Sequence, residues 1–290
     1  MAAQFAVIGG SKAYELLAEG TISGTRLGER KTPYGDSQAI YLLRVNSEEI
    51  LFLSRHGEKG YEVSAPYVNY RANIYALKDM GVNKVVAWSG PGAISREFSV
   101  GDFVLVDDVI DETRGRPGTF FEGKGIGFIR QSPVFCPCLR QSLMNVLERL
   151  GLSYKDHGTY VCTQGPRLET PAEIRKFASY GGEMVGMTLV PEVFLARELE
   201  MCYAALCYVS NYAEGIIEKR PFRPGELFEG LSTEDDKKRM SKAVAELPKI
   251  IMELAVQEHR VSVPCSCPDS MQRYKVDGRI GEDWRDWLEM

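Results

Sequence analysis

The sequence predicts an α/β fold: one domain in which helices flank a central mixed, mostly parallel sheet. Short apolar runs bounded by Gly, Asp, Asn or Ser recur along the chain, and amphipathic segments of helical periodicity separate them. This alternation of strands and helices is typical of a mostly parallel sheet. The predicted strands are residues 5–8, 50–53, 84–88, 103–106, 159–163, 184–187 and 202–210.

Helix start and stop signals lie between these strands. Residues 66–80 and 139–150 each end at a glycine, Gly81 and Gly151, which favours a helix C-terminus. Thr170-Pro-Ala-Glu173 combines an N-cap hydroxyl, a proline at the first helical position and a glutamate that completes a capping box. Residues 233–260 start with acidic residues and continue with an apolar stripe, which predicts the longest helix.

Neither an internal repeat nor a low-complexity linker divides the chain, so we predict that residues 1–260 form one domain. Residues 261–290 differ in character, because a Pro- and Ser-rich start is followed by Trp284 and Trp287. Two tryptophans would be unusual in a free tail. We therefore expect residues 261–290 to pack on the body or on a neighbouring subunit.

The 290 residues carry 35 Lys and Arg against 40 Asp and Glu, a formal charge of −5. This mild acidity provides no positive field to gather a phosphate backbone, which argues against a nucleic-acid partner. The N-terminal sequence has no basic segment followed by an apolar core, and no run approaches the roughly 20 apolar residues of a membrane helix. We therefore expect a cytoplasmic protein without a membrane partner.

The seven cysteines, an odd number in a long chain, are a poor disulfide framework. Three lie in apolar runs and are expected to be small buried side chains: Cys162, Cys202 and Cys207. Two Cys-x-Cys pairs remain, Cys136 with Cys138 and Cys265 with Cys267. Together the two pairs could ligate zinc, but zinc-binding cysteines are usually about two to four residues apart, so no metal site is predicted. A redox-active or strained disulfide at the second pair stays open, and unreactive thiols are the default.

Four predicted strands end in hydroxyls, glycines or cations. Alone, each strand end is explained as well by a tight turn, a surface salt bridge or a capped loop histidine. Because the carboxyl ends of parallel strands meet at one sheet edge, together they predict a site for a phosphate-sized anion. Its candidate residues are Ser11, Arg55, His56, Ser89, Gly90 and Thr188.

Glu169 and Asn211 are the two other polar residues with a candidate role. Alone, Glu169 is explained as a first-turn acid of a helix and Asn211 as a turn residue. Facing one pocket, the amide would suit N7 and O6 of a 6-oxopurine, and the carboxylate would suit N1–H and N2–H.

In these residues the chain resembles the trimeric purine nucleoside phosphorylase and 5′-methylthioadenosine phosphorylase family, over roughly residues 4–255. The matching segments are Ile8-Gly-Gly-Ser11, Arg55-His-Gly57, Val68-Asn-Tyr-Arg-Ala-Asn73, Gly101-Asp102, Gly165-Pro-Arg-Leu-Glu-Thr170, Val185-Gly-Met-Thr-Leu-Val-Pro-Glu192 and Ser210-Asn-Tyr212. The resemblance implies a nucleoside phosphorylase-like α/β domain and a homotrimer or a dimer of trimers. It also implies reversible phosphorolysis of purine nucleosides to free purine and pentose 1-phosphate.

The resemblance implies roles for individual residues as well. The six anion-site candidates would bind phosphate, with His56 and Asn211 acting in catalysis. Met187 would contact the ribose, and Glu169, Asn211 and Leu168 would bind the nucleoside. Phe128 stands where family members often carry a histidine lent to the neighbouring subunit's 5′ pocket. Inorganic phosphate would be a co-substrate, with no metal or other cofactor required.

The pair Glu169 and Asn211 resembles the 6-oxopurine enzymes, because methylthioadenosine phosphorylases tend to have Ser and Asp there. We therefore expect inosine, guanosine or methylthioinosine as substrates. Two alternatives stay open. The first is a 5′-methylthioadenosine phosphorylase. The second is a nucleoside-binding homologue without turnover, because Pro91 removes a backbone N–H from the loop after the third predicted strand.

Overall fold

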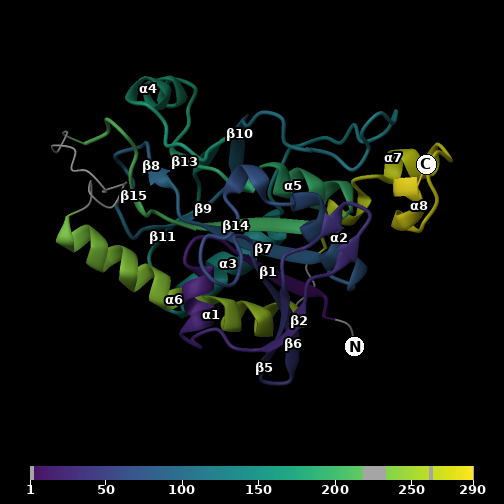
Figure 1. The fold of residues 1–290 in the computed structure, drawn as a ribbon, viewed down its shortest axis with the longest axis horizontal. Helices are drawn as coiled ribbons and strands as arrows, with labels where there is room; N and C mark the ends of the chain where they lie inside the picture. The colour runs from purple at the N-terminus through teal and green to yellow at the C-terminus, as the bar shows by residue number, and fades with distance from the viewer. Residues whose placement is uncertain (1–2, 218–232, 261–263, 290) are drawn as a thin grey trace.

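The computed structural model describes residues 3–217, 233–260 and 264–289, and contains a large mixed sheet whose central strands are parallel (Figure 1). This eight-stranded sheet has the order β11-β9-β14-β7-β1-β6-β5-β2. Its strands are β1 (Phe5–Gly9), β2 (Thr25–Gly28), β5 (Ile40–Val45), β6 (Glu48–Ser54), β7 (Lys84–Ser89), β9 (Phe103–Leu105), β11 (Tyr154–Lys155) and β14 (Cys202–Tyr208). The predicted fold class is confirmed, and all seven predicted strands are present.

A second, five-stranded sheet of order β10-β12-β13-β8-β15 was not predicted as a separate unit. It consists of β8 (Gly92–Ala93), β10 (Asp108–Glu112), β12 (Thr159–Thr163), β13 (Met184–Gly186) and β15 (Asn211–Tyr212). The chain passes from the large sheet to this one four times, from β7 to β8, β9 to β10, β11 to β12 and β14 to β15. A small hairpin of β3 (Lys31–Thr32) and β4 (Gly35–Asp36) completes the strands of the described residues.

Helices cover both faces of the large sheet (Figure 1). Along β1, Ala6 and Ile8 belong to one apolar core, while Phe5 and Val7 belong to the other, as the alternation of side chains along a strand requires. The first core contains α2 (Tyr70–Asp79) and α5 (Leu189–Glu198). The second contains α1 (Ala13–Ala18), α3 (Pro137–Arg149) and α6 (Glu234–Arg260).

Two short helical elements lie at the margins of the body. The η1 turn (Ala65–Tyr67) leads into α2, and α4 (Pro171–Ser179) lies over the small sheet. The helix α4 begins with the predicted capping box: the Glu173 backbone N–H donates to the Thr170 hydroxyl at 3.2 Å, and the Thr170 N–H donates to the Glu173 carboxylate at 2.8 Å.

The described part of the C-terminal tail packs against the body. It forms η3 (Cys267–Asp269), α7 (Gln272–Val276) and α8 (Trp284–Glu289), beside α2 and α5 in Figure 1. Tyr274 and Trp287 are buried in the same apolar core as these helices, and Lys275 forms a 2.8 Å ion pair with Glu200. Among the described residues, none of the helices combines the length and apolar character that crossing a lipid bilayer requires.

Candidate active site

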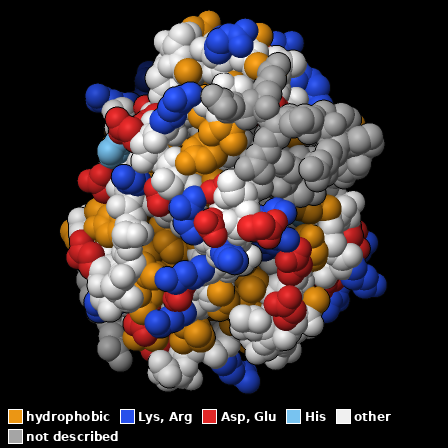
Figure 2. All heavy atoms as spheres, turned by 90° about the vertical axis from the view of Figure 1, so that its left-hand side faces the viewer, with side chains coloured by type: hydrophobic (Ala, Val, Ile, Leu, Met, Phe, Trp, Pro, Cys, Tyr) orange, Lys and Arg blue, Asp and Glu red, His pale blue; other side chains and the backbone are white. Residues whose placement is uncertain are grey.

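The predicted site residues gather where the two sheets join. β1, β6 and β7 are parallel neighbours, so Ser11, His56 and Ser89 follow the same edge of the large sheet. In the small sheet β12 and β13 end at the edge where β8 and β15 begin, with Asn211 paired to Gly92 and Gly92 to Val185. On this side of the molecule hydrophobic side chains are exposed between side chains of both charges (Figure 2).

Two buried hydroxyls meet at this edge. The Ser89 Oγ lies 3.4 Å from the Thr188 Oγ1 and 3.1 Å from the Tyr160 hydroxyl. A β-carbon at Gly186 would collide with the Tyr160 hydroxyl, so glycine at position 186 makes room for it. The structure therefore brings two predicted phosphate-binding hydroxyls together and adds Tyr160.

The Gly10–Ser11 turn lies beside this group. The Tyr208 hydroxyl donates to the Ser11 carbonyl at 3.2 Å, and Tyr208 also lies where a side chain at Gly90 would be. A β-carbon at Gly10 would collide with the Trp88 carbonyl and come within 2.9 Å of an Arg55 nitrogen. Both glycines thus permit close packing, of Tyr208 against Gly90 and of Trp88 and Arg55 against Gly10.

Arg55 is completely buried in a bidentate ion pair with Glu192. Its Nε and Nη2 donate to the two carboxylate oxygens at 2.8 and 2.7 Å, and the Tyr203 hydroxyl donates to one of them at 2.6 Å. Burial alone would lower the pKa of the guanidinium, but the Glu192 charge outweighs it and raises that pKa. Only the Nη1 end, 3.4 Å from the Trp88 carbonyl, faces the Gly10 turn.

His56 is a neutral ring with a defined tautomer. Burial and the Arg55 charge lower its pKa to about 4. Its Nδ1 lies 2.9 Å from the Val63 carbonyl, which can only accept, so Nδ1 carries the proton and Nε2 is an acceptor. Tyr61 stacks on the imidazole with centroids 4.3 Å apart, and its hydroxyl lies 2.8 Å from the Ser11 Oγ. The Nδ1–H of His56 is therefore already engaged within the protein, and only Nε2 remains for a ligand.

Glu169 and Asn211 are both partly buried on the small-sheet side. The Thr163 hydroxyl donates to a Glu169 carboxylate oxygen at 2.5 Å, and burial raises the pKa of this carboxyl. The Asn211 Oδ1 accepts from the Ser210 hydroxyl at 2.6 Å, and its Nδ2 donates to the Tyr212 carbonyl at 2.8 Å. The amide is thus held in one orientation, with one N–H free of these two bonds.

The three remaining candidates differ in setting. Met187 follows β13, and its sulfur lies where a side chain at Gly165 would be, while Gly165 itself has a φ of 63°. Leu168 is 37% exposed. Phe128 is 78% exposed, and its backbone N–H donates to the Tyr274 hydroxyl of the tail at 2.8 Å.

Sequence reasoning missed the tyrosines that build the site, Tyr61, Tyr160 and Tyr208. Tyr160 and Tyr208 lie in apolar strands and read as core residues. Tyr61 lies in a polar loop after Gly57, where the only signal was an aromatic residue close to the Arg-His-Gly segment. The partner of Arg55 is 137 positions away in the chain, which no local pattern reveals.

Comparison with known proteins identifies the family. The chain belongs to the phosphorylase superfamily, whose model matches residues 4–255. It is 40% identical to the 6-oxopurine nucleoside phosphorylase of Pyrococcus furiosus over 278 residues, which cover 93% of this chain and 98% of that protein. It is 39% identical to a probable S-methyl-5′-thioinosine phosphorylase of Methanothermobacter thermautotrophicus over 276 residues, 95% of this chain and 91% of the relative.

Solved structures agree with this assignment. A methylthioadenosine phosphorylase from an antarctic soil metagenomic library is 29% identical, with a TM-score of 0.80 over 94% of this chain and 92% of the other. A methylthioadenosine phosphorylase of Schistosoma mansoni in complex with tubercidin is 25% identical, with a TM-score of 0.75 over 99% and 95%. The family resemblance inferred from the motifs is confirmed.

Proposed function

We propose that the chain is a purine nucleoside phosphorylase for 6-oxopurine nucleosides such as inosine, guanosine or methylthioinosine. It uses inorganic phosphate and yields the free purine and pentose 1-phosphate in a reversible reaction. The names of the two relatives support the substrate class. The amide of Asn211, held in one orientation beside the site, is the observation that carries the proposal.

The Asn211 amide selects the purine edge. Because Nδ2 already donates one hydrogen to the Tyr212 carbonyl, its second hydrogen is available for an acceptor on the base. N7 and O6 of a 6-oxopurine are acceptors, whereas a 6-amino group is a donor that this N–H would oppose. Glu169 complements the amide, because an ionised carboxylate accepts from N1–H and N2–H of the same ring.

The hydroxyl cluster supplies donors for phosphate. Ser89 and Thr188 offer buried hydroxyls, and Ser11 adds a third beyond the Gly10 turn. The acceptor Nε2 of His56 suits the O–H of hydrogenphosphate, which would orient that ion. Arg55 would contribute its Nη1 end and the position of the turn, since Glu192 occupies the rest of its fork.

The charges that develop during phosphorolysis explain how the site residues would act. A phosphate oxygen forms a bond to the anomeric carbon while the bond from that carbon to N9 breaks, and its electron pair moves onto the purine. The Asn211 N–H stabilises the negative charge that develops at N7, and phosphate stabilises the oxocarbenium-like ribose. The reaction needs neither a protein nucleophile nor a cofactor.

Assembly and location extend the proposal. We propose a homotrimer or a dimer of trimers in which the exposed Phe128 reaches the 5′ pocket of a neighbouring subunit. An apolar ring there would accept a methylthio group. We also propose a cytoplasmic enzyme without nucleic-acid or membrane partners. The seven thiols, which form no disulfide in the described structure, suit a reducing compartment.

Release of hypoxanthine from inosine in phosphate buffer and in phosphate-free buffer tests the reaction class. Phosphate-dependent release with formation of ribose 1-phosphate is expected. Ser89→Ala should lower kcat/KM for phosphate about 10- to 100-fold, since it removes a charge-assisted hydrogen bond. The control Ser270→Ala removes a hydroxyl that donates to the Arg197 carbonyl in the tail and should leave this value unchanged. Nucleoside binding without phosphate-dependent release would favour the non-catalytic alternative.

A further inference from the structure

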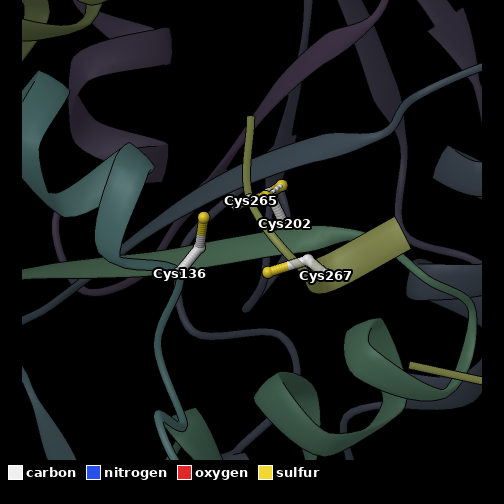
Figure 3. A group of neighbouring side chains, drawn as sticks. All are labelled: Cys136, Cys202, Cys265 and Cys267. Atoms are coloured by element: carbon white, nitrogen blue, oxygen red, sulfur yellow. Dashed lines mark hydrogen bonds between the residues drawn. The ribbon is translucent and has the colours of Figure 1, made fainter. Parts of the chain in front are cut away.

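Four cysteines from three separate segments come together in the fold (Figure 3). Cys136 precedes α3, Cys202 begins β14, and Cys265 and Cys267 belong to the C-terminal tail. Their sulfur atoms all lie within 4.8 Å of one another, and the Cys202 and Cys265 sulfurs are 3.3 Å apart. The cluster thus differs from the two Cys-x-Cys pairs seen in the sequence, because Cys202 belongs to it and Cys138 does not.

We propose that Cys136, Cys202, Cys265 and Cys267 together bind one structural Zn²⁺ ion. Tetrahedral zinc with four thiolates has Zn–S bonds of about 2.3 Å, which places the sulfurs about 3.8 Å from one another. The observed separations are compatible with this value, since the Cys202 and Cys265 sulfurs are 3.3 Å apart and no pair is more than 4.8 Å apart. A sulfur-only tetrahedral set favours zinc over the hard cations, which prefer oxygen.

Backbone hydrogen bonds fix Cys136 and Cys202 in the body, and Cys267 within the turn of the tail, independently of any ion. The Cys136 N–H donates to the Tyr203 carbonyl at 2.8 Å, which ties the start of α3 to β14. The Cys202 N–H donates to the Asn83 carbonyl at 2.8 Å, and the Ser270 N–H to the Cys267 carbonyl at 3.3 Å. A site already arranged in this way loses little conformational entropy when it binds an ion.

The surroundings of the cluster suit negatively charged sulfur. Cys136 is the N-cap of the 13-residue helix α3, whose positive end favours a thiolate. Lys84 and Glu258 line the same small cavity as a 2.8 Å ion pair, so together they add no net charge to it. Three of the four cysteines are buried and Cys265 is partly exposed, which leaves a route for the ion.

The position of the cluster indicates a structural ion. Four protein sulfurs leave no open coordination position for a substrate. Cys202 lies at the start of β14 and Tyr208 at its end. The cluster and the candidate active site therefore lie at opposite ends of this strand, about 20 Å apart along it. The ion would fasten the tail, with its buried Trp287, to α3 and β14.

Metal analysis of the full-length chain tests the proposal. The protein is produced with zinc in the medium, purified under nitrogen without reductant or chelator, and weighed by native and denaturing mass spectrometry. About one equivalent of zinc per chain is expected, together with seven free thiols after denaturation. Cobalt bound in place of zinc should show the ligand-field bands of a tetrahedral tetrathiolate.

Variants identify the ligands. The double substitution Cys265→Ser/Cys267→Ser should reduce zinc to below about 0.2 equivalents and make the tail sensitive to trypsin, without removing a strand residue. The matched control Cys138→Ser changes a cysteine that borders the same cavity and donates to the Pro264 carbonyl, and it should retain one equivalent.

Three results would overturn the assignment. The first is zinc-free protein with seven free thiols. The second is a mass deficit of two hydrogens per disulfide formed within the cluster. The third is a zinc content that the double substitution does not change, or that Cys138→Ser abolishes.

Discussion

Replacing Arg55 with methionine removes the cation of a buried ion pair and leaves its carboxylate behind. Both side chains of the Arg55–Glu192 pair are 0% exposed, and two hydrogen bonds of 2.7 and 2.8 Å join them. Breaking a buried pair by removing one partner costs about 3–5 kcal/mol, because the remaining charge is uncompensated. The Tyr203 hydroxyl, 2.6 Å from Glu192, stays as the carboxylate's remaining donor among the contacts described above.

A second pair in the same chain provides the control. Arg167 also binds both carboxylate oxygens of Glu173, through Nη2 at 2.7 Å and Nη1 at 2.9 Å, but its side chain is 68% exposed. Arg167→Met should therefore cost only about 0–1 kcal/mol. Glu173 also belongs to the α4 capping box, and Arg167→Met retains both residues that form the box, Thr170 and Glu173.

Urea unfolding at fixed protein concentration, followed by tryptophan fluorescence, measures both effects. The double variant Arg55→Met/Glu192→Leu replaces the pair with apolar groups and should be more stable than Arg55→Met alone. Equal losses for Arg55→Met and Arg167→Met would refute the reasoning, as would a double variant less stable than Arg55→Met.

Three further predictions concern the site. Burial raises the pKa of Glu169, and base recognition needs its ionised form, so kcat/KM for inosine should fall with decreasing pH at a pKa above that of an ordinary glutamate. Glu169→Gln should remove this acidic limb of the pH profile. An unchanged limb would exclude Glu169 as its source. Asn211→Asp should shift the ratio of kcat/KM values toward adenosine by about tenfold or more, measured by purine release, and no shift would mean that Asn211 does not read the base. Gly186→Ala should lower the free energy of unfolding by about 1–3 kcal/mol and raise KM for phosphate, because the added methyl group collides with Tyr160 next to Ser89. Gly281→Ala, where space is open, should do neither. Equal thermal stability of the two variants would contradict this prediction.

The buried central strands and their strand-end residues were predictable because both depend on local patterns, whereas β2, β5 and β10 were not predicted. The central parallel strands β1, β6, β7 and β14 are largely buried on both faces and read as apolar runs, and polar residues such as Ser89 stand where they end. The separate small sheet was not predictable, since β8 and β15 are two-residue strands without a pattern of their own. Their pairing depends on the full topology.

Partners far apart in sequence account for the rest. The Arg55–Glu192 pair forms because α5 packs against the large sheet. Two of the guanidinium nitrogens of Arg55, which we expected to bind phosphate, therefore bind Glu192 instead. The tautomer of His56 follows from a carbonyl in the next loop, that of Val63. Cys202 was read as a core residue because its run is apolar, and only the folded tail brings Cys265 and Cys267 to it.

The specificity ratio between 6-oxo and 6-amino nucleosides tests the central claim most directly. The values of kcat/KM for inosine, guanosine, adenosine and methylthioadenosine are measured in parallel with saturating phosphate. The orientation of Asn211 and the carboxylate of Glu169 predict that a 6-oxopurine nucleoside is preferred by at least about tenfold, because the wrong base leaves buried polar groups unpaired. A preference of that size for adenosine or methylthioadenosine would contradict the account.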